Sequence, residues 1–508
     1  MSDKFRKLIF PSLLAGTALS LLVRASAKTT QARDAQIGGD YDAIDAYVEG
    51  QMRRLRIPGA SLAIVKGKRI VHRGGFGEAR PRGETPTPQT PFFIGSLTKS
   101  ITATAVMQLV EAGKVELDAP VQRYLPWFRV ADPNVSAEMT VRHLLNQTSG
   151  MPMLASEIAA ADFYDGEDAT ERQVRSLSTL KINRPVGVKC EYSNFNYNIL
   201  GSIVEAASGE TYAGYIQKHI FNPLEMRHSY ATKAAALQDG LAVGHRHWFG
   251  FPFPVPDWPV PRGSLPSGQL ISTAEDLAHY LIAHLNGGQY KDKQILSNAG
   301  IDEMHRGVKE LKLGDFGGGL YGMGWFEIDM GDEKTYSHGG NVPDFSAYMA
   351  LIPGQRKAFV LLLNADPYGL PMITAEIGNG VTTLLAGQAP GPIQLEFVQW
   401  IIRLLPLIPL LQLKGVMATL GKLRKWEQEP ELRPTDGGAW AQEILLPLVP
   451  NLGLAAFLAY LHRSRLIQFL NLFMPDLGLI CNISGGLAGI WSILRTRLML
   501  QAVHKTRQ

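Results

Sequence analysis

The sequence predicts an α/β fold of the α+β type. In it, helices flank one antiparallel sheet, a helical region is inserted between the strands, and a transmembrane helical segment follows. Two strand-turn-strand patterns, far apart in the chain, enclose mostly helical patterns, and the composition becomes strongly apolar after residue 391. Two hairpins that bury apolar faces are most simply accommodated as neighbours in one sheet, with the intervening helices packed against it.

The first 27 residues have the pattern of a secretory signal peptide or an N-terminal anchor. Basic residues precede a charge-free apolar run at 8–23, and an Ala-Ser-Ala sequence then supplies the small side chains of a cleavage site. Arg24 separates the run from this site, so an uncleaved anchor remains an alternative. In either form, the segment predicts that the middle of the chain leaves the cytoplasm.

The middle of the chain, residues 40–390, has the pattern of a single α/β unit. Its first hairpin joins residues 60–65 to 69–73 through a Lys-Gly-Lys turn. Its second joins 346–352 to 358–363 through a Pro-Gly turn. We expect both hairpins to pair in the same antiparallel sheet.

Helical patterns occupy much of the region between the hairpins. Residues 101–111 and 197–207 carry apolar side chains at helical spacing, and the glycines at 113 and 209 mark the ends of these helices. A long proline-rich and aromatic loop at 251–266 either lines a site or covers a helix.

The C-terminal part, residues 391–508, predicts two to three membrane spans. The stretches 444–461 and 477–494 are free of charge and near the lower length limit for crossing a bilayer. A third run, 397–413, contains an arginine and two prolines, so it spans with a kink, lies in the interface, or caps the α/β unit. A buried helical domain of a soluble protein is the alternative.

Basic residues predict the orientation of these spans. One cluster follows the first apolar run and another follows the last, namely Lys414, Lys422, Arg424, Lys425 and Arg433, then Arg495, Arg497, Lys505 and Arg507. Because basic loops stay in the cytoplasm, three spans would place the α/β unit on the extracytoplasmic side. Asp476 begins the last stretch, and we expect it near an interface or facing other helices.

Charge and cysteine content exclude several classes of protein. The 508 residues include 50 Lys and Arg against 46 Asp and Glu, a net charge of +4 that is too small to indicate a nucleic-acid partner. Two cysteines exclude a disulfide-rich scaffold, and no metal-ligand spacing such as His-Glu-x-x-His is present. Nucleic acid is therefore not an expected partner. The expected partners are a small-molecule or peptide substrate, for which the candidate site residues below are the basis, and membrane lipid, for which the apolar runs are the basis. The oligomeric state is left open.

Ser96 and Lys99 are candidates for nucleophilic catalysis. They lie three residues apart at the start of the 101–111 helix, so both side chains project from one face of its first turn. Apolar residues on nearly all sides predict a buried helix, and burial lowers the pKa of a lysine so that it accepts a proton from a nearby hydroxyl. The motif alone is weak, because Ser178 and Lys181 repeat it without a following helix.

Two later elements strengthen this interpretation. Tyr192 and Asn194 precede a helical pattern and supply a phenol for proton transfer and a carboxamide for hydrogen bonds. His338, Gly340 and Asn341 follow in a Ser-His-Gly-Gly-Asn sequence that we place between strands, where small glycines let a substrate backbone approach a strand edge.

With these three motifs in order, the sequence resembles the serine β-lactamase and penicillin-binding-protein-like hydrolases. The resemblance is greatest to the branch with class C β-lactamases, DD-peptidases and related esterases, and the Ser-x-x-Lys element is an established mark of this superfamily. Further landmarks are Thr140-Val141-Arg142-His143-Leu144-Leu145-Asn146-Gln147-Thr148-Ser149-Gly150, Asn222-Pro223-Leu224-Glu225-Met226 and Ser272-Thr273-Ala274-Glu275-Asp276-Leu277. The resemblance covers residues 40–390.

The resemblance implies roles for the site residues. Ser96 would be the nucleophile, Lys99 would help to deprotonate it, and Tyr192 would act as proton shuttle or base. Asn194 would position Lys99 and the substrate. The backbone N–H groups of Ser96 and Asn341 would form the oxyanion hole.

Two positions depart from the family pattern. His338 stands where many members carry the lysine of Lys-Thr-Gly, a form similar to the esterase and peptidase branches. Asp344 stands where the family usually shows glycine.

We therefore expect a membrane-anchored extracytoplasmic serine hydrolase that forms an acyl-enzyme on Ser96 and needs no metal or other cofactor. The acyl donor would be a peptide, an ester or a β-lactam. The alternative is a non-enzymatic membrane protein whose penicillin-binding-like domain binds cell-wall peptides or a partner.

Overall fold

The computed structural model describes residues 41–504, apart from residues 82, 183, 258, 313–317, 331–332 and 394–395. The predicted signal peptide or anchor at residues 1–27 lies outside the described residues. Both predicted hairpins, the helices between them and the apolar C-terminal runs lie within them.

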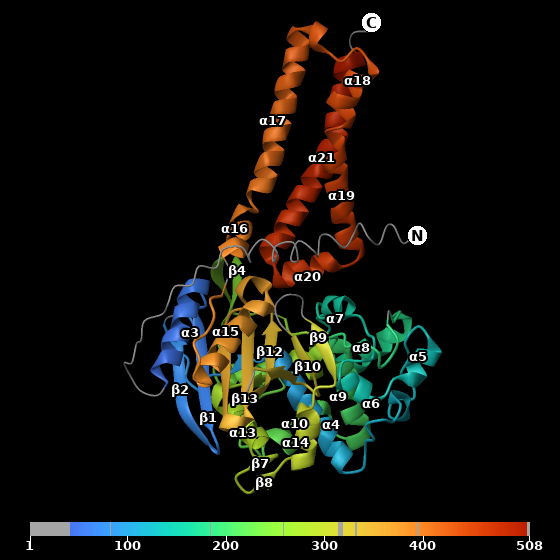
Figure 1. Cartoon of the computed structure of the whole chain (residues 1–508). Helices are drawn as coiled ribbons and strands as arrows, with labels where there is room; N and C mark the ends of the chain where they lie inside the picture. The colour runs from blue at the N-terminus through green and yellow to red at the C-terminus, as the bar shows by residue number, and fades with distance from the viewer. Residues whose placement is uncertain are drawn as a thin grey trace.

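One antiparallel sheet forms the centre of the α/β unit (Figure 1). Within the described residues its strand order is β2-β1-β14-β13-β12-β11-β10-β9. The strands are β1 Gly59–Lys66, β2 Arg69–Gly77, β9 Lys309–Lys312, β10 Gly318–Tyr321, β11 Phe326–Asp329, β12 Lys334–Val342, β13 Phe345–Ile352 and β14 Lys357–Leu363. Because β1 pairs with β14, from Ala60 opposite Leu363 to Lys66 opposite Lys357, the prediction that both hairpins share one sheet is confirmed.

Helices cover both faces of the central strands. Along β1, Leu62 and Ile64 belong to one hydrophobic core, and Ala63 and Val65 belong to the other, as the alternation of side chains along a strand requires. The first core includes helices α3 (Asp42–Leu55) and α15 (Pro371–Leu385), and the second includes α4 (Thr98–Glu111), α9 (Asn194–Ser208) and α13 (Ala274–Leu285). Because these strands are buried on both faces, their sequences are continuous apolar runs.

Helix α4 is buried in the second core, as its sequence predicts. All of its residues from Thr98 to Met107 are buried. Its polar side chains have partners: the hydroxyls of Thr102 and Thr104 lie 2.6 and 2.9 Å from those of Tyr212 and Tyr280. A buried helix that satisfies its polar groups in this way forms a rigid support for residues in its first turn.

Two of the sequence expectations are wrong. The 337–341 motif does not lie between strands but inside β12, and the 251–266 segment is not all loop, because Phe251–Val255 forms strand β5 against β4 (Gly244–Trp248). The short strands β9, β10 and β11 have four residues each, too few for a clear pattern. The prolines in β5 kept its sequence from showing a strand pattern. The strand tolerates them because it pairs on one side only.

Three long apolar helical segments project from one end of the α/β unit (Figure 1). They are Val398–Gln428, Gly437–Arg463 and Pro475–Ala502, and each is long and apolar enough to cross a membrane. The first contains α16 (Glu396–Leu404) and α17 (Leu407–Gln428), which are separated at Leu405 and Pro406. The second segment includes α19 (Leu448–Arg463), and the third lies within α21 (Pro475–His504). The short helix α20 (Leu466–Phe473) connects these two segments. The run at 397–413, for which a kink was one expectation, is broken at Leu405 and Pro406.

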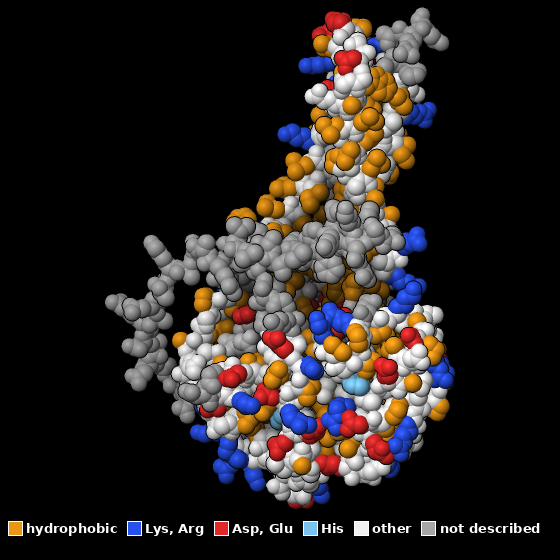
Figure 2. Space-filling model, turned by 45° about the vertical axis from the view of Figure 1, so that its right-hand side comes forward, with side chains coloured by type: hydrophobic (Ala, Val, Ile, Leu, Met, Phe, Trp, Pro, Cys, Tyr) orange, Lys and Arg blue, Asp and Glu red, His pale blue; other side chains and the backbone are white. Residues whose placement is uncertain are grey.

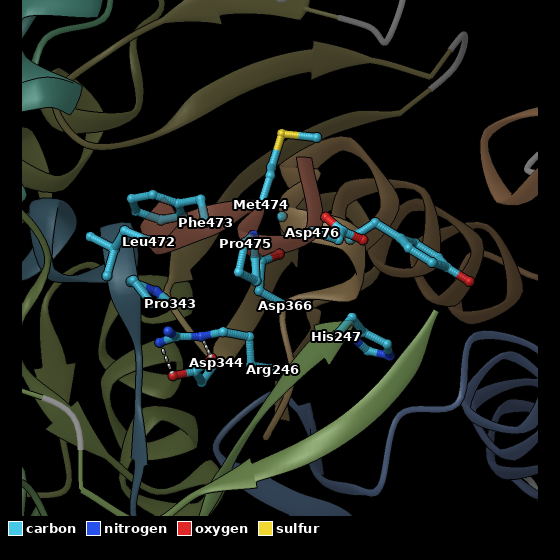
Figure 3. Close-up of a pocket in the computed structure, with 12 residues that line it drawn as sticks. Arg246, His247, Pro343, Asp344, Asp366, Leu472, Phe473, Met474, Pro475 and Asp476 are labelled. Atoms are coloured by element: carbon cyan, nitrogen blue, oxygen red, sulfur yellow. Dashed lines mark hydrogen bonds and ion pairs between the residues drawn. The ribbon is translucent and has the colours of Figure 1, made fainter. Parts of the chain in front are cut away.

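Asp476, at the start of α21, is hydrogen-bonded to the α/β unit. Its carboxylate accepts a hydrogen bond from the backbone N–H of Phe249 in the β4–β5 turn at 3.2 Å, and from that of Leu477 at 2.8 Å. Figure 3 shows a small pocket at this junction, lined by residues of both parts. The third span is thus attached to the β4–β5 hairpin.

Asp344, where the resemblance led us to expect glycine, lies beside the same junction. Its φ of 73° is in the left-handed region that glycine favours, and its carboxylate, 1% exposed, forms a bidentate ion pair with Arg246 at 2.8 and 2.7 Å (Figure 3). The ion pair compensates both for burial of the charge and for the strained backbone.

Arg246→Met is expected to destabilise the α/β unit by about 3–5 kcal/mol, because it leaves a buried charge without its partner. Thermal unfolding in detergent measures the effect. The double variant Arg246→Met/Asp344→Gly removes the orphaned carboxylate and supplies a residue suited to the backbone, so it should regain most of the loss. A double variant as unstable as the single one would contradict this account.

Candidate active site

Ser96 and Lys99 meet at the start of α4. Ser96 lies in the short helix η1 (Gly95–Leu97), and Lys99 in the first turn of α4 donates through Nζ to its Oγ at 2.9 Å. The same Nζ donates to Asn194 Oδ1 at 2.7 Å and to the backbone oxygen of Ser267 at 2.6 Å. These three acceptors match the three N–H bonds of an ammonium group.

Burial poises Lys99 for proton transfer. The side chain is completely buried, which lowers the pKa of Lys99 to about 7, and the Glu157 carboxylate partly opposes this shift. A substantial fraction of Lys99 is therefore neutral near neutral pH, with a nitrogen lone pair 2.9 Å from the Ser96 hydroxyl. This arrangement can remove a proton from Ser96.

Tyr192 covers the lysine but is not poised as a base. Its ring centroid lies 4.8 Å from Lys99 Nζ. Burial raises the pKa of Tyr192 well above its ordinary value, and the nearby Tyr321 adds to the shift, whereas Ser96 opposes it. Its phenol is therefore protonated at neutral pH, which favours Lys99 as the group that first accepts the Ser96 proton.

Asn194 connects the lysine to Glu157, a residue that the sequence reasoning missed. Asn194 is the first residue of α9, and its Nδ2 donates to Glu157 Oε1 at 3.0 Å while its Oδ1 accepts from Lys99. Glu157 lies in α7 (Met153–Ala159), and burial raises the pKa of its carboxyl while Lys99 lowers it. Its place in the sequence carries no motif, so only the fold reveals it.

The β12 strand presents a free edge beside Ser96. Strand β11 pairs with β12 only from Lys334 to Ser337, which leaves residues 338–342 without a partner on that side among the described strands. Helix η1 packs against this part of β12 so closely that a Cβ on Gly340 would lie 2.1 Å from the Ile94 oxygen, and one on Gly95 would lie 2.5 Å from the Asn341 nitrogen. The backbone nitrogens of Ser96 and Asn341 therefore come from directly packed segments.

Comparison with known proteins identifies the family. The family model described as beta-lactamase matches residues 44–376, which include every site residue named above. The chain belongs to the beta-lactamase family. Members of this family are usually serine hydrolases.

Curated relatives of this beta-lactamase-family chain include penicillin-binding proteins. Penicillin-binding protein 4 of Amycolatopsis lactamdurans is 32% identical over 319 residues, which cover 61% of this chain and 81% of that protein. Protein flp of Staphylococcus aureus (strain MW2) is 27% identical over 342 residues, 66% of each protein. The chain thus spans slightly less than two thirds of the length of flp.

A solved structure confirms the predicted fold. The octameric penicillin-binding protein homologue from Pyrococcus abyssi matches with a TM-score of 0.62 and 30% identity, covering 69% of this chain and 78% of that chain. The resemblance inferred from the three motifs is thereby confirmed.

His338, which the resemblance places at the position of a family lysine, is buried and neutral. It is 2% exposed, and burial together with Lys99 lowers the pKa of His338 to about 3. Its Nδ1 lies 2.6 Å from the Gly339 oxygen, which only accepts, so Nδ1 carries the hydrogen and Nε2 accepts from the Tyr321 hydroxyl at 3.3 Å. Rather than presenting a charge to a substrate, His338 lies behind Tyr192, with ring centroids 6.2 Å apart.

Gly340 and Asn341 also have structural roles that the sequence analysis did not predict. The missing side chain of Gly340 leaves room for the backbone of Ile94. The Asn341 side chain donates to Asp366 Oδ1 at 2.9 Å, which fixes the end of β12. The segment 251–266 covers a helix, since the Pro266 oxygen accepts from Thr102 of α4 at 2.7 Å. Ser267, one residue beyond it, is a contact of Lys99 that the sequence reasoning missed.

No group of three or more His, Cys, Asp or Glu side chains suited to a metal ion occurs among the residues that the structure describes. The chemistry of the site rests on the hydroxyl, amine, phenol and carboxamide groups of its side chains and on backbone N–H groups.

Gly340→Ala is expected to reduce turnover by on the order of 10²-fold or more, because the added methyl group would push η1 away from β12 and misplace an oxyanion donor. The matched control is Gly339→Ala, since a Cβ on Gly339 meets only Tyr348 at 3.8 Å. Steady-state ester hydrolysis by the two purified variants checks this. Equal losses in both would contradict the assigned role of the Gly340 contact.

Proposed function

We propose that this chain is a membrane-anchored serine hydrolase that acts through an acyl-enzyme on Ser96, with its catalytic unit on the extracytoplasmic side. The observation that carries the proposal is the fully buried Lys99 amine, 2.9 Å from the Ser96 hydroxyl. A lysine is costly to bury without a task or a partner, and here its neutral form is suited to deprotonating a nucleophile.

In the acylation step, Lys99 takes the proton of Ser96 as Oγ bonds to the carbonyl carbon of the substrate. The electron pair of the carbonyl double bond moves to its oxygen, which the backbone N–H groups of Ser96 and Asn341 stabilise. Collapse of the tetrahedral intermediate breaks the bond to the leaving group. The leaving group takes a proton from Tyr192, which regains one from Lys99.

Deacylation repeats these steps with water as the nucleophile. Water loses a proton to the Tyr192 and Lys99 pair, attacks the Ser96 ester carbonyl, and releases the acid while Ser96 regains its proton. Asn194 holds the lysine and offers its carboxamide to the acyl group. Glu157 is a positioning residue, because it acts on Asn194 by a hydrogen bond and on Lys99 by its charge.

The free edge of β12 supports an extended acyl donor. A peptide-like substrate could pair with residues 338–342 as an added strand while its scissile carbonyl meets Ser96. The fold and site accommodate carboxypeptidase, esterase or β-lactamase-like hydrolysis of a small molecule or peptide. The neutral His338 lacks the cation that would attract a substrate carboxylate, which favours an ester or a neutral amide.

The arrangement of the three apolar segments supports the proposed orientation. The end of α17 and the end of α21 both lie far from the α/β unit (Figure 1), and these ends carry the basic residues Lys422, Arg424, Lys425, Arg495 and Arg497. Basic residues favour the cytoplasmic side, so the α/β unit lies on the opposite side. We propose residues 1–27 as signal peptide or anchor, 40–390 as the hydrolase domain and 391–508 as its membrane segment.

Intact-mass measurement over time, with a penicillin and with an activated short-chain ester, tests the proposal. We expect an added acyl mass on the full-length protein in detergent, and peptide mapping should place it on Ser96. Neither an adduct nor consumption of either compound would favour the non-enzymatic alternative, in which the domain binds peptides without reacting.

A further inference from the structure

The junction with the membrane segment fixes the level of the bilayer relative to the α/β unit. The first span begins at Val398 and the third at Pro475, so these residues mark the near boundary of the hydrocarbon. At the start of the third span, Asp476 holds the β4–β5 turn through the Phe249 N–H. Because the turn is hydrogen-bonded to a residue at this boundary, the β4–β5 hairpin reaches the headgroup region.

The hairpin carries exposed aromatic side chains at that level. Phe251 and Phe253, two residues apart and therefore on the same face of β5, are 53% and 52% exposed. The Arg56 guanidinium lies 4.1 Å from the Phe251 ring centroid and donates to the Gly250 oxygen at 3.1 Å. Aromatic rings together with a cation are the side chains that favour the membrane interface.

Other elements at this end have the same character. Trp400 of α16 is 60% exposed near the start of the first span. Helix α20 lies across the end of the α/β unit between the second and third spans, and it contacts α7 (Figure 1). On α7, Met153 and Leu154 are exposed. Figure 2 shows hydrophobic side chains along the projecting C-terminal helices.

We propose that the face formed by Phe251, Phe253, Trp400, Met153 and Leu154 contacts the surface of a lipid bilayer, and that the acyl donor is an amphiphile presented from that surface. The inference rests on the membrane anchoring proposed above. This face is continuous with the three proposed spans, which argues for lipid as its occupant. The spans would hold the β4–β5 hairpin close to the bilayer, so a second protein would have to enter the space between them.

Helix α7 connects this face to the chemistry. Its N-terminal residues Met153 and Leu154 are exposed beside α20, and four residues later Glu157 binds the carboxamide of Asn194. A substrate with an apolar chain in the leaflet would thus meet α7 next to Lys99 and Asn194. Partition into the bilayer also concentrates such a substrate at the site.

Site-directed spin labelling tests the lipid contact in the full-length protein. The two free cysteines, Cys190 and Cys481, are replaced by alanine, and a nitroxide is attached at Phe253→Cys. Val71→Cys is the matched control, because Val71 is 40% exposed on β2, where it lies between the residues that pair with Ile64 and Val65 near the far end of β1. In phosphatidylcholine and phosphatidylglycerol vesicles, we expect the label at 253 to be accessible to oxygen and shielded from a water-soluble nickel chelate, and the label at 71 to show the reverse.

Two results would overturn the lipid contact: chelate access at 253 equal to that at 71, or access of neither reagent, which would mean that protein covers the face. Neither depends on catalysis, so they are separate from a failure of the proposed acyl-enzyme chemistry. For the substrate, Phe251→Ser/Phe253→Ser should slow hydrolysis of a long-chain ester held in vesicles several-fold and leave a soluble short-chain ester unaffected, with Val71→Ser as control. Equal rates of the double variant and wild type on the vesicle ester would overturn the amphiphilic substrate.

Discussion

Ser96→Ala is expected to eliminate the covalent adduct and to lower turnover by on the order of 10⁶-fold, the scale seen when the nucleophile is removed from a serine hydrolase. The reason is geometric. Ser96 Oγ lies 2.9 Å from the fully buried Lys99 amine in the first turn of α4, and alanine leaves the amine with no hydroxyl to deprotonate. The remaining hydrogen bonds of Lys99 to Asn194 and Ser267 should preserve the fold.

The chain supplies its own control for this experiment. Ser178 and Lys181 have the same Ser-x-x-Lys spacing, but both are exposed and no long helix follows them. Ser178→Ala should therefore leave adduct formation and turnover unchanged. Intact mass and steady-state ester hydrolysis compare the two variants with wild type. Retained turnover by Ser96→Ala would remove the proposed nucleophile.

The sequence predicted the parts of the fold whose patterns are local. The two hairpins and the helices that end near Gly113 and Gly209 could be predicted because each has a strong periodicity and a turn or capping glycine. The pairing of β1 with β14 followed, because hairpins with apolar faces must be buried together. Long apolar helices in the C-terminal part also followed from composition, and the structure extends the helical run that begins near residue 397 through α17.

Features that depend on tertiary contacts could not be predicted. Glu157 acquires its place only when α7 packs on the first turn of α9, and the Ser267 oxygen has no side-chain signature at all. The surroundings of Gly340 and His338 could not be predicted for the same reason. Whether a glycine faces a substrate or the backbone of η1, and whether a histidine is charged or buried behind Tyr192, depends on neighbours that are distant in sequence.

Lys99→Met is expected to lower kcat/KM by about 10²–10⁴-fold, the usual contribution of a positioned general base. In wild type, kcat/KM should rise with pH as Lys99 loses its proton. Since burial lowers the pKa of Lys99 to about 7, this rise should be centred near pH 7, far below the ordinary lysine value of about 10.4. Ester hydrolysis from pH 5 to 9, corrected for spontaneous hydrolysis, measures the profile, and Lys99→Met should lack this rise.

Glu157→Gln tests whether Lys99, and not another titrating group, causes the rise of kcat/KM with pH. The negative charge of Glu157 stabilises the protonated amine and so raises the pKa of Lys99, opposing burial. Glutamine removes that charge but keeps an oxygen that accepts from Asn194. The rise in kcat/KM should therefore move to lower pH, an effect that a purely structural residue would not produce. Glu171→Gln, which breaks only an exposed pair with Arg175, is the control. A profile that is unmoved, or moved to higher pH, would mean that Lys99 is not the group whose deprotonation controls acylation.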